Sequence, residues 1–197
     1  DGFRKSMIVN KALAKATGTY IIHTDGDIIL NKHFIEDHLY VARKGYVTTG
    51  SRGQTSEKLK NKLIETQRVD INPFTKGVSR KVNVMRLKPL MKMFLDSYKK
   101  NIPYFCRGCN LAFWREDFIS VNGFNEDIPH IGGEDHELVA RMNNIGIKRQ
   151  FIKFGATQYH LYHPKRAFED HPGNIKIMSD VLQYKLQRCE NGIDKYL

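Results

Sequence analysis

At residues 20–27 the chain reads Tyr-Ile-Ile-His-Thr-Asp-Gly-Asp, a short apolar run that ends in two acidic residues. The apolar part has the length of a buried strand, so Asp25 and Asp27 lie at the carboxyl end of that strand, where ligands bind in open α/β sheets. Two carboxylates this close repel each other unless a cation joins them. Oxygen ligands on a loop favour Mg²⁺ or Mn²⁺. The alternative is an ordinary Asp-Gly turn in solvent.

Segments typical of helices and strands alternate outward from this stretch. Asn31 is the expected N-cap of the helix that follows it. The alternation predicts an α/β fold. The predicted helices cover residues 6–16, 31–44, 55–68, 115–121, 134–144 and 172–190, and the predicted strands cover residues 20–24, 46–49, 109–114, 149–154 and 156–162.

The charge of the chain is unevenly distributed. Its 197 residues carry a net charge of +11, and residues 51–100 alone hold 13 Lys and Arg against 4 Asp and Glu. Such a segment could dock a phosphate, an acidic glycan, a membrane surface or a nucleic acid. A solvated basic face without a partner is the alternative. The hydrophobic fraction of 41% predicts a folded core.

The cysteines and the apolar runs indicate a compartment. Cys106, Cys109 and Cys189 form no disulfide framework, which favours a reducing environment. The Cys-x-x-Cys pair lacks the second pair that a zinc ribbon needs, so ordinary thiols are expected. No apolar run approaches the roughly 20 residues of a membrane span, and no signal peptide opens the chain. We therefore expect a cytoplasmic location, at the inner face of the membrane if the basic segment docks there.

Two further constellations could carry chemistry. Gly133, Glu134 and Asp135 open a predicted helix, where a carboxylate could act as a general base or merely cap the helix. His160 and His163 could ligate a metal, although such a pair is more often structural. A site that combined Asp27 with His160 would favour Mn²⁺ over Ca²⁺.

In their order and spacing, these constellations resemble family 2 glycosyltransferases of the GT-A fold. The resemblance is closest to the branch whose C-terminal half is similar to the β-1,4-galactosyltransferase and chondroitin-polymerase domains. It covers about residues 1–50 and 100–165, and it is carried by residues 2–27, 107–126 and 132–160. Where close relatives often carry a Trp before the double Gly, this chain has His130 and Ile131, which leaves the acceptor open.

The resemblance implies a mixed central sheet flanked by helices. It implies a GT-A catalytic domain over residues 1–165, with a basic insertion at about 51–100 and a C-terminal helical extension over residues 166–197. The family domain begins with further strands, so an N-terminally truncated domain is expected, with weak donor binding by this chain alone.

The resemblance also implies roles for individual residues. Asp27 and His160 would bind the metal, with His163 as a further candidate ligand. Asp135 would be the general base, and Glu134 would hold hydroxyl groups of the donor or acceptor. The residues expected to contact the donor are Phe3, Lys5, Asn10, Asp25 and Gly133.

The implied activity is that of a hexosyl- or N-acetylhexosaminyl-transferase. It would use Mn²⁺ or Mg²⁺ to move a sugar from a nucleotide-diphosphate donor, expected to be UDP-linked, to a hydroxyl of a glycan or lipid-linked acceptor. A single base implies one displacement with inversion. The expected setting is bacterial polysaccharide synthesis, with peripheral membrane contact through the basic segment and no nucleic acid. A non-catalytic polyanion-binding module and an inactive glycosyltransferase relative are the alternatives.

Overall fold

The computed structural model describes residues 3–164 and 171–197. Its helices are α1 (Lys5–Lys15), α2 (Phe34–Val41), α3 (Glu57–Thr66), α4 (Arg115–Ser120), α5 (Glu134–Asn144) and α6 (Pro172–Gln183), with the 3₁₀ helices η1 (Lys81–Val84), η2 (Lys88–Phe94), η3 (Gly108–Asn110) and η4 (Ile193–Tyr196). Its strands are β1 (Tyr20–His23), β2 (Ile28–Leu30), β3 (Tyr46–Gly50), β4 (Gly53–Thr55), β5 (Val78–Ser79), β6 (Leu111–Trp114), β7 (Lys148–Ile152) and β8 (Gln158–His160).

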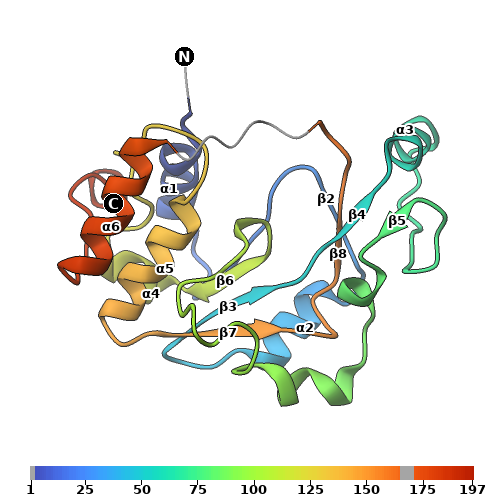
Figure 1. Cartoon of the computed structure of the whole chain (residues 1–197), viewed down its shortest axis with the longest axis horizontal. Coiled ribbons are helices and arrows are strands. Elements are labelled where there is room, and N and C mark those ends of the chain that lie inside the picture. The colour runs from blue at the N-terminus through green and yellow to red at the C-terminus, as the bar shows by residue number, and fades with distance from the viewer. Residues whose placement is uncertain (1–2, 165–170) are drawn as a thin grey trace.

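The strands form two mixed sheets. The first has the order β1-β6-β3-β7, with β6 antiparallel to both neighbours and β3 parallel to β7. The second has the order β2-β8-β4-β5, with only β8 and β4 parallel. The expected α/β fold with mixed sheet and flanking helices is confirmed, and its strands divide into two sheets. They are linked closely, because β4 follows β3 after two residues (Figure 1).

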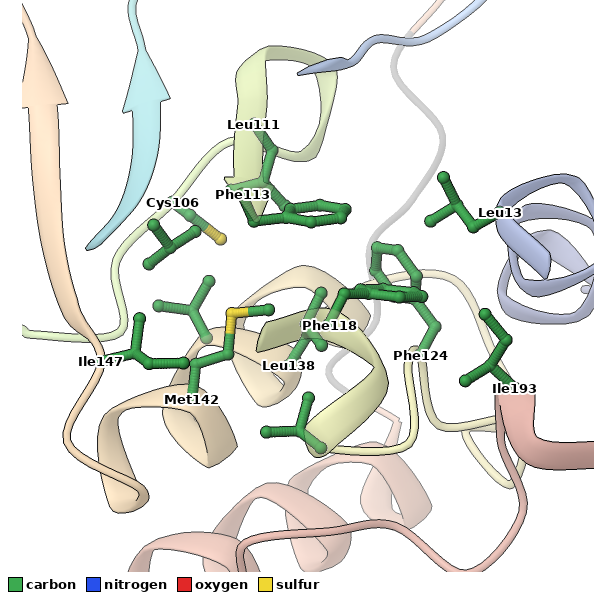
Figure 2. Close-up of a cluster of buried hydrophobic side chains, with 13 residues drawn as sticks. Leu13, Cys106, Leu111, Phe113, Phe118, Phe124, Leu138, Met142, Ile147 and Ile193 are labelled. Atoms are coloured by element: carbon green, nitrogen blue, oxygen red, sulfur yellow. The ribbon is translucent and has the colours of Figure 1, made fainter. Parts of the chain in front are cut away.

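The first sheet separates two hydrophobic clusters, because alternate strand residues point to opposite faces. Ile21 packs against the larger cluster, which joins the sheet to α1, α4 and α5, whereas Ile22 packs against a cluster built from α2 and η2. Figure 2 shows the larger cluster, where Leu13 of α1 and Ile193 of η4 approach the aromatic rings of Phe118 and Phe124. A third cluster joins α3 to the second sheet.

Several predicted boundaries differ from the structure. The helix expected from Asn31 begins at Phe34, because Asn31 forms a turn in which its side chain accepts the N–H of His33 and its carbonyl accepts the N–H of Phe34. The last helix ends at Gln183 rather than Glu190. Strands β2, β4 and β5 were not predicted, since two or three residues show no periodicity.

Buried polar side chains fix the junction between the two sheets. The Nδ2 of Asn110 donates to the carbonyls of Ser51 and Ala156, and its Oδ1 pairs with Nε2 of His38. Only glycine fits at position 50, because a Cβ there would lie 2.5 Å from Nδ2 of Asn110. These bonds hold the ends of β3 and β6 together where they meet the cavity described below.

The predicted domain limits stay a prediction. The proposed boundary between residues 165 and 166 lies outside the described residues. The basic segment 51–100 contributes β4, α3 and β5, which include two strands of the second sheet. In the described part of the chain, no helix is both long and apolar enough to span a membrane.

Candidate active site

The three sequence constellations converge on one cavity of about 1060 Å³. It lies where β1, the start of α1, the start of α5 and the end of β8 meet. Every predicted site residue except Asn10 lines it. These residues are Phe3, Lys5, Asp25, Asp27, Gly133, Glu134, Asp135, His160 and His163.

Asp27, His160 and His163 form a cluster that fits a metal ion. One ligand atom from each lies within 4.8 Å of the others. The Oδ2 of Asp27 is 3.5 Å from Nε2 of His160 and 3.7 Å from Nε2 of His163. One carboxylate and two imidazoles suit Mn²⁺ and other first-row divalent ions. Burial, aided by nearby Arg52, lowers the pKa of His160, which favours the neutral imidazole that metal ligation requires.

The pairing of β2 with β8 brings this cluster together. Ile28 pairs with His160 in the antiparallel register, and the N–H of Leu161 donates to the carbonyl of Asp27. The position of His160 relative to Asp27 is therefore fixed by backbone hydrogen bonds. His163 lies beyond the end of β8 and is more exposed.

Lys5 lies among three carboxylates at the other side of the cavity. Its Nζ is 3.0 Å from Oε1 of Glu134, 3.6 Å from Oδ1 of Asp25 and 3.6 Å from Oδ1 of Asp135. Burial disfavours the charged ammonium, but the attraction of Asp135, Glu134 and Asp25 outweighs it and raises the pKa of Lys5. Lys5 is therefore a fixed positive charge that ties the start of α1 to the start of α5.

Asp135 is the candidate general base of the cavity. Burial, followed by the charges of Glu134 and Asp25, raises its pKa to about 7 against the opposing charge of Lys5. Its Oδ1 is buried and accepts no hydrogen bond from the described residues. A carboxylate with a pKa near neutrality can accept a proton in the working pH range.

The start of α5 is built to hold these carboxylates. Gly133 has φ of 87°, which only glycine adopts without strain, and Oε2 of Glu134 accepts the N–H of Gly132. Further along the same helix, Arg141 pairs with Glu137 in the core and donates to the carbonyls of Val121 and Gly123. The helix is thereby anchored behind the site.

Asn10 does not join the site. Its side chain is fully buried, donates to the carbonyl of Phe124 and to Oε1 of Glu126, and accepts the N–H of Phe124. The residue expected to hold the nucleotide instead attaches α1 to the loop after α4.

Sequence reasoning missed several residues of the cavity. Arg52 reaches it from the β3–β4 connection, and Phe105, Arg107, Gly108 and His136 complete its wall. A Cβ at Gly108 would lie 1.9 Å from Oδ2 of Asp135, so the backbone passes directly against the candidate base. The Arg-Gly-Cys-Asn motif at residues 107–110 was the one available signal for this contact.

Comparisons with known proteins indicate the fold. A family model described as the N-terminal domain of galactosyltransferase matches residues 90–164. Solved structures with similar folds include GalNAc-T7 with UDP, GalNAc and Mn²⁺ (TM-score 0.56, 15% identity, 92% of this chain and 34% of that chain covered). The fold is that of a GT-A glycosyltransferase.

A second similar structure is the mannosyltransferase PcManGT from Pyrobaculum calidifontis in complex with GDP-Man and Mn²⁺. It has a TM-score of 0.51 and 17% identity, with 83% of this chain and 38% of that chain covered. The GT-A-like chain thus spans about a third of the length of these two structures. No curated protein matches its sequence.

Proposed function

We propose that this chain belongs to the catalytic domain of a metal-dependent glycosyltransferase of family 2. Its reaction would move a hexosyl or N-acetylhexosaminyl group from a UDP-linked sugar to a hydroxyl of a glycan or lipid-linked acceptor. The observation that carries the proposal is the sharing of one cavity by the Asp27–His160–His163 cluster and the carboxylates around Lys5. One similar structure contains UDP, GalNAc and Mn²⁺, and the other contains GDP-Man and Mn²⁺, which supports a divalent cofactor and a nucleotide-sugar donor.

Asp27, His160 and His163 would hold Mn²⁺ or Mg²⁺. The bound ion would neutralise charge on the donor diphosphate and make it a better leaving group. The mixed carboxylate and imidazole ligands favour Mn²⁺, because Mg²⁺ prefers oxygen ligands.

Asp135 would take the proton of the acceptor hydroxyl at Oδ1. As that proton leaves, the hydroxyl oxygen forms a bond to the anomeric carbon of the donor, and the bond from that carbon to the diphosphate oxygen breaks. Attack opposite the leaving group inverts the anomeric centre. Glu134, held by Lys5, would orient sugar hydroxyls beside the base. A positioned base contributes about 10²–10⁴-fold to such a reaction.

The basic segment would place the enzyme on an anionic membrane surface. Ile64, Val69 and Phe74 are 54%, 64% and 78% exposed, and they lie among the lysines and arginines around α3. In Figure 1, α3 and β5 project at the edge of the molecule. Apolar side chains inside a basic surface suit insertion between anionic lipid headgroups. This placement would fit a bacterial enzyme at the cytoplasmic face that builds polysaccharide on lipid-linked acceptors.

Membrane docking is tested by sedimentation with phosphatidylglycerol and phosphatidylcholine vesicles. Binding to the anionic vesicles alone, lost in Phe74→Ser, is the expected result. Failure to bind anionic vesicles at low salt would remove this part of the proposal. Salt-sensitive binding to RNA instead would favour the non-catalytic polyanion-binding alternative.

The activity is tested with a panel of nucleotide-sugars and Mn²⁺. Nucleotide release from one donor, abolished by EDTA and by Asp27→Ala, would establish the donor and the metal requirement together. Asp135→Asn should retain binding of UDP with Mn²⁺ while losing transfer. A chain that binds neither Mn²⁺ nor any nucleotide would be an inactive relative.

A further inference from the structure

Two arginines face the cavity without a carboxylate partner. The Nε atoms of Arg52 and Arg107 are buried and have no hydrogen-bond partner in the described part of the chain. Neither guanidinium forms an ion pair with a described residue. Among the described residues, the guanidinium of Arg52 makes one hydrogen bond, a weak one from Nη1 to Sγ of Cys109 at 3.3 Å.

The two guanidiniums also repel each other. Burial lowers the pKa of Arg107, and the neighbouring charges of Arg52 and Arg80 lower it further. A partly buried guanidinium ordinarily finds a carboxylate or phosphate, because desolvation is costly when uncompensated. Elsewhere in this protein, Arg86 pairs with Asp37 and Arg141 with Glu137. Arg149 forms no ion pair with a described residue, but its Nη2 donates to the carbonyls of Tyr98 and Lys99. The pair in the cavity therefore has the properties of an anion site.

The surroundings of Arg107 indicate the acceptor side of the cavity. Arg107 directly precedes Gly108, whose backbone lies against Asp135. A base must touch the acceptor hydroxyl, so groups beside Asp135 face the acceptor. The centre of the guanidinium also lies 5.8 Å from the ring centroid of Phe105, which lines the same cavity. An aromatic ring beside a guanidinium can contact the face of a sugar and its acidic group together.

The metal cluster supplies a separate positive charge for the donor. Asp27, His160 and His163 would hold the ion that meets the diphosphate, which leaves the arginine pair for a second anion. We propose that Arg52 and Arg107 bind the carboxylate of an acidic sugar in the acceptor. This inference rests on the proposed function. It specifies the acceptor of the proposed transferase as a glycan that contains a uronic acid.

The test measures binding of two probes to the whole chain. The first probe is UDP with Mn²⁺, followed by calorimetry. The second is a uronic acid, either glucuronate or a hyaluronan tetrasaccharide, followed by saturation-transfer NMR with UDP and Mn²⁺ present. The neutral methyl ester of each uronic acid is the matched ligand control. Lys15→Gln is the matched protein control, because it removes an exposed positive charge far from the cavity residues.

The expected result is binding of the uronic acids but not of their esters. Arg107→Gln and Arg52→Gln should each weaken uronate binding by about tenfold or more, as loss of a charge-assisted bidentate contact predicts. Arg107→Gln should leave the affinity for UDP with Mn²⁺ within about twofold. Arg107→Lys keeps the positive charge but loses the two parallel N–H donors of the guanidinium. Its affinity for uronate should therefore lie between that of the unaltered chain and that of Arg107→Gln.

Other outcomes overturn the inference. Equal binding of acid and ester, or no uronate binding by the unaltered chain, would exclude a carboxylate subsite. Loss of UDP affinity in Arg52→Gln and Arg107→Gln, with uronate binding retained, would assign the pair to the diphosphate. If UDP with Mn²⁺ does not bind while uronate does, the subsite stands and the proposed transferase function fails.

Discussion

The Nζ of Lys5 lies 3.0 Å from Oε1 of Glu134, although 129 residues separate the two in sequence. The same ammonium is 3.6 Å from both Asp25 and Asp135. One positive charge thus serves three carboxylates, which keeps them together without neutralising them. Burial, together with the charges of Glu134 and Asp25, raises the pKa of Asp135 to about 7 against the opposing charge of Lys5, so this carboxylate can accept a proton near neutral pH.

Replacing Lys5 should raise the pKa of Asp135 further. Lys5→Met removes the charge that opposes burial, so Asp135 should titrate above about 7. The acid limb of the pH–activity profile should move to higher pH. The free energy of unfolding should fall by about 1–3 kcal/mol at neutral pH, because the carboxylates then repel one another without a counterion. Lys15→Met is the control, and an unchanged acid limb would show that Lys5 does not tune the base.

Asp135→Asn should stabilise the protein while abolishing transfer. The pKa of Asp135 is raised from 3.8 to about 7, so its favourable contribution is complete below pH 3.8 and is lost as pH rises through 7. Asparagine carries no such penalty. Urea unfolding should show a variant more stable by about 1–3 kcal/mol at pH 8, with the difference vanishing towards pH 4. Equal stability at both pH values would contradict this assignment.

Gly108→Ala should lower the rate of sugar transfer by a larger factor than the affinity for UDP. Its new Cβ would lie 1.9 Å from Oδ2 of Asp135, so the base must move. A displacement of about 1 Å at a reacting group can reduce the rate by about 100-fold. Gly18→Ala is the matched control, because its Cβ would find its nearest neighbour at 3.7 Å. Transfer rates of the two variants, measured beside UDP affinity, give the comparison.

His160→Ala should weaken Mn²⁺ binding more than His163→Ala. His160 is held in β8 by pairing with Ile28, and its side chain is 9% exposed, whereas that of His163 is 49% exposed. We expect a loss of about tenfold or more for His160→Ala and a smaller one for His163→Ala, since a preorganised ligand contributes more. Calorimetry with Mn²⁺ checks the order, and Asp70→Ala, at an exposed site, is the control.

Arg141→Met should destabilise the whole domain. It leaves the carboxylate of Glu137 buried without its partner and removes donors to the carbonyls of Val121 and Gly123. Breaking a buried pair costs about 3–5 kcal/mol. The double variant Arg141→Met with Glu137→Met should recover part of that loss in urea unfolding. A double variant less stable than the single one would mean that Glu137 has another essential partner.

Local patterns in the sequence were sufficient for much of the fold. The spacing of apolar residues and the glycines after helices predicted α1, α4 and α5 and the strand before Asp25, because these elements follow from contacts between near neighbours. The residues of the Asp27–His160–His163 cluster and the carboxylates around Lys5 could also be named from the sequence as candidates, because acidic and histidine residues clustered in short motifs.

Only the tertiary structure decided how distant segments combine. Short strands such as β2 exist because a partner strand supplies their hydrogen bonds, and that pairing sets His160 beside Asp27. The assignment of Asn10 to the nucleotide was replaced by a buried role, since an amide can serve a ligand or a backbone loop equally well. The sequence could not show that Arg52 and Arg107 lack a carboxylate partner among the described residues, because unpaired charges are recognised only when their surroundings are known. The sequence by itself determined the local elements and the chemical groups. The long-range packing decided which charges are paired, which are buried and which face the cavity, because pairing and burial depend on neighbours far along the chain.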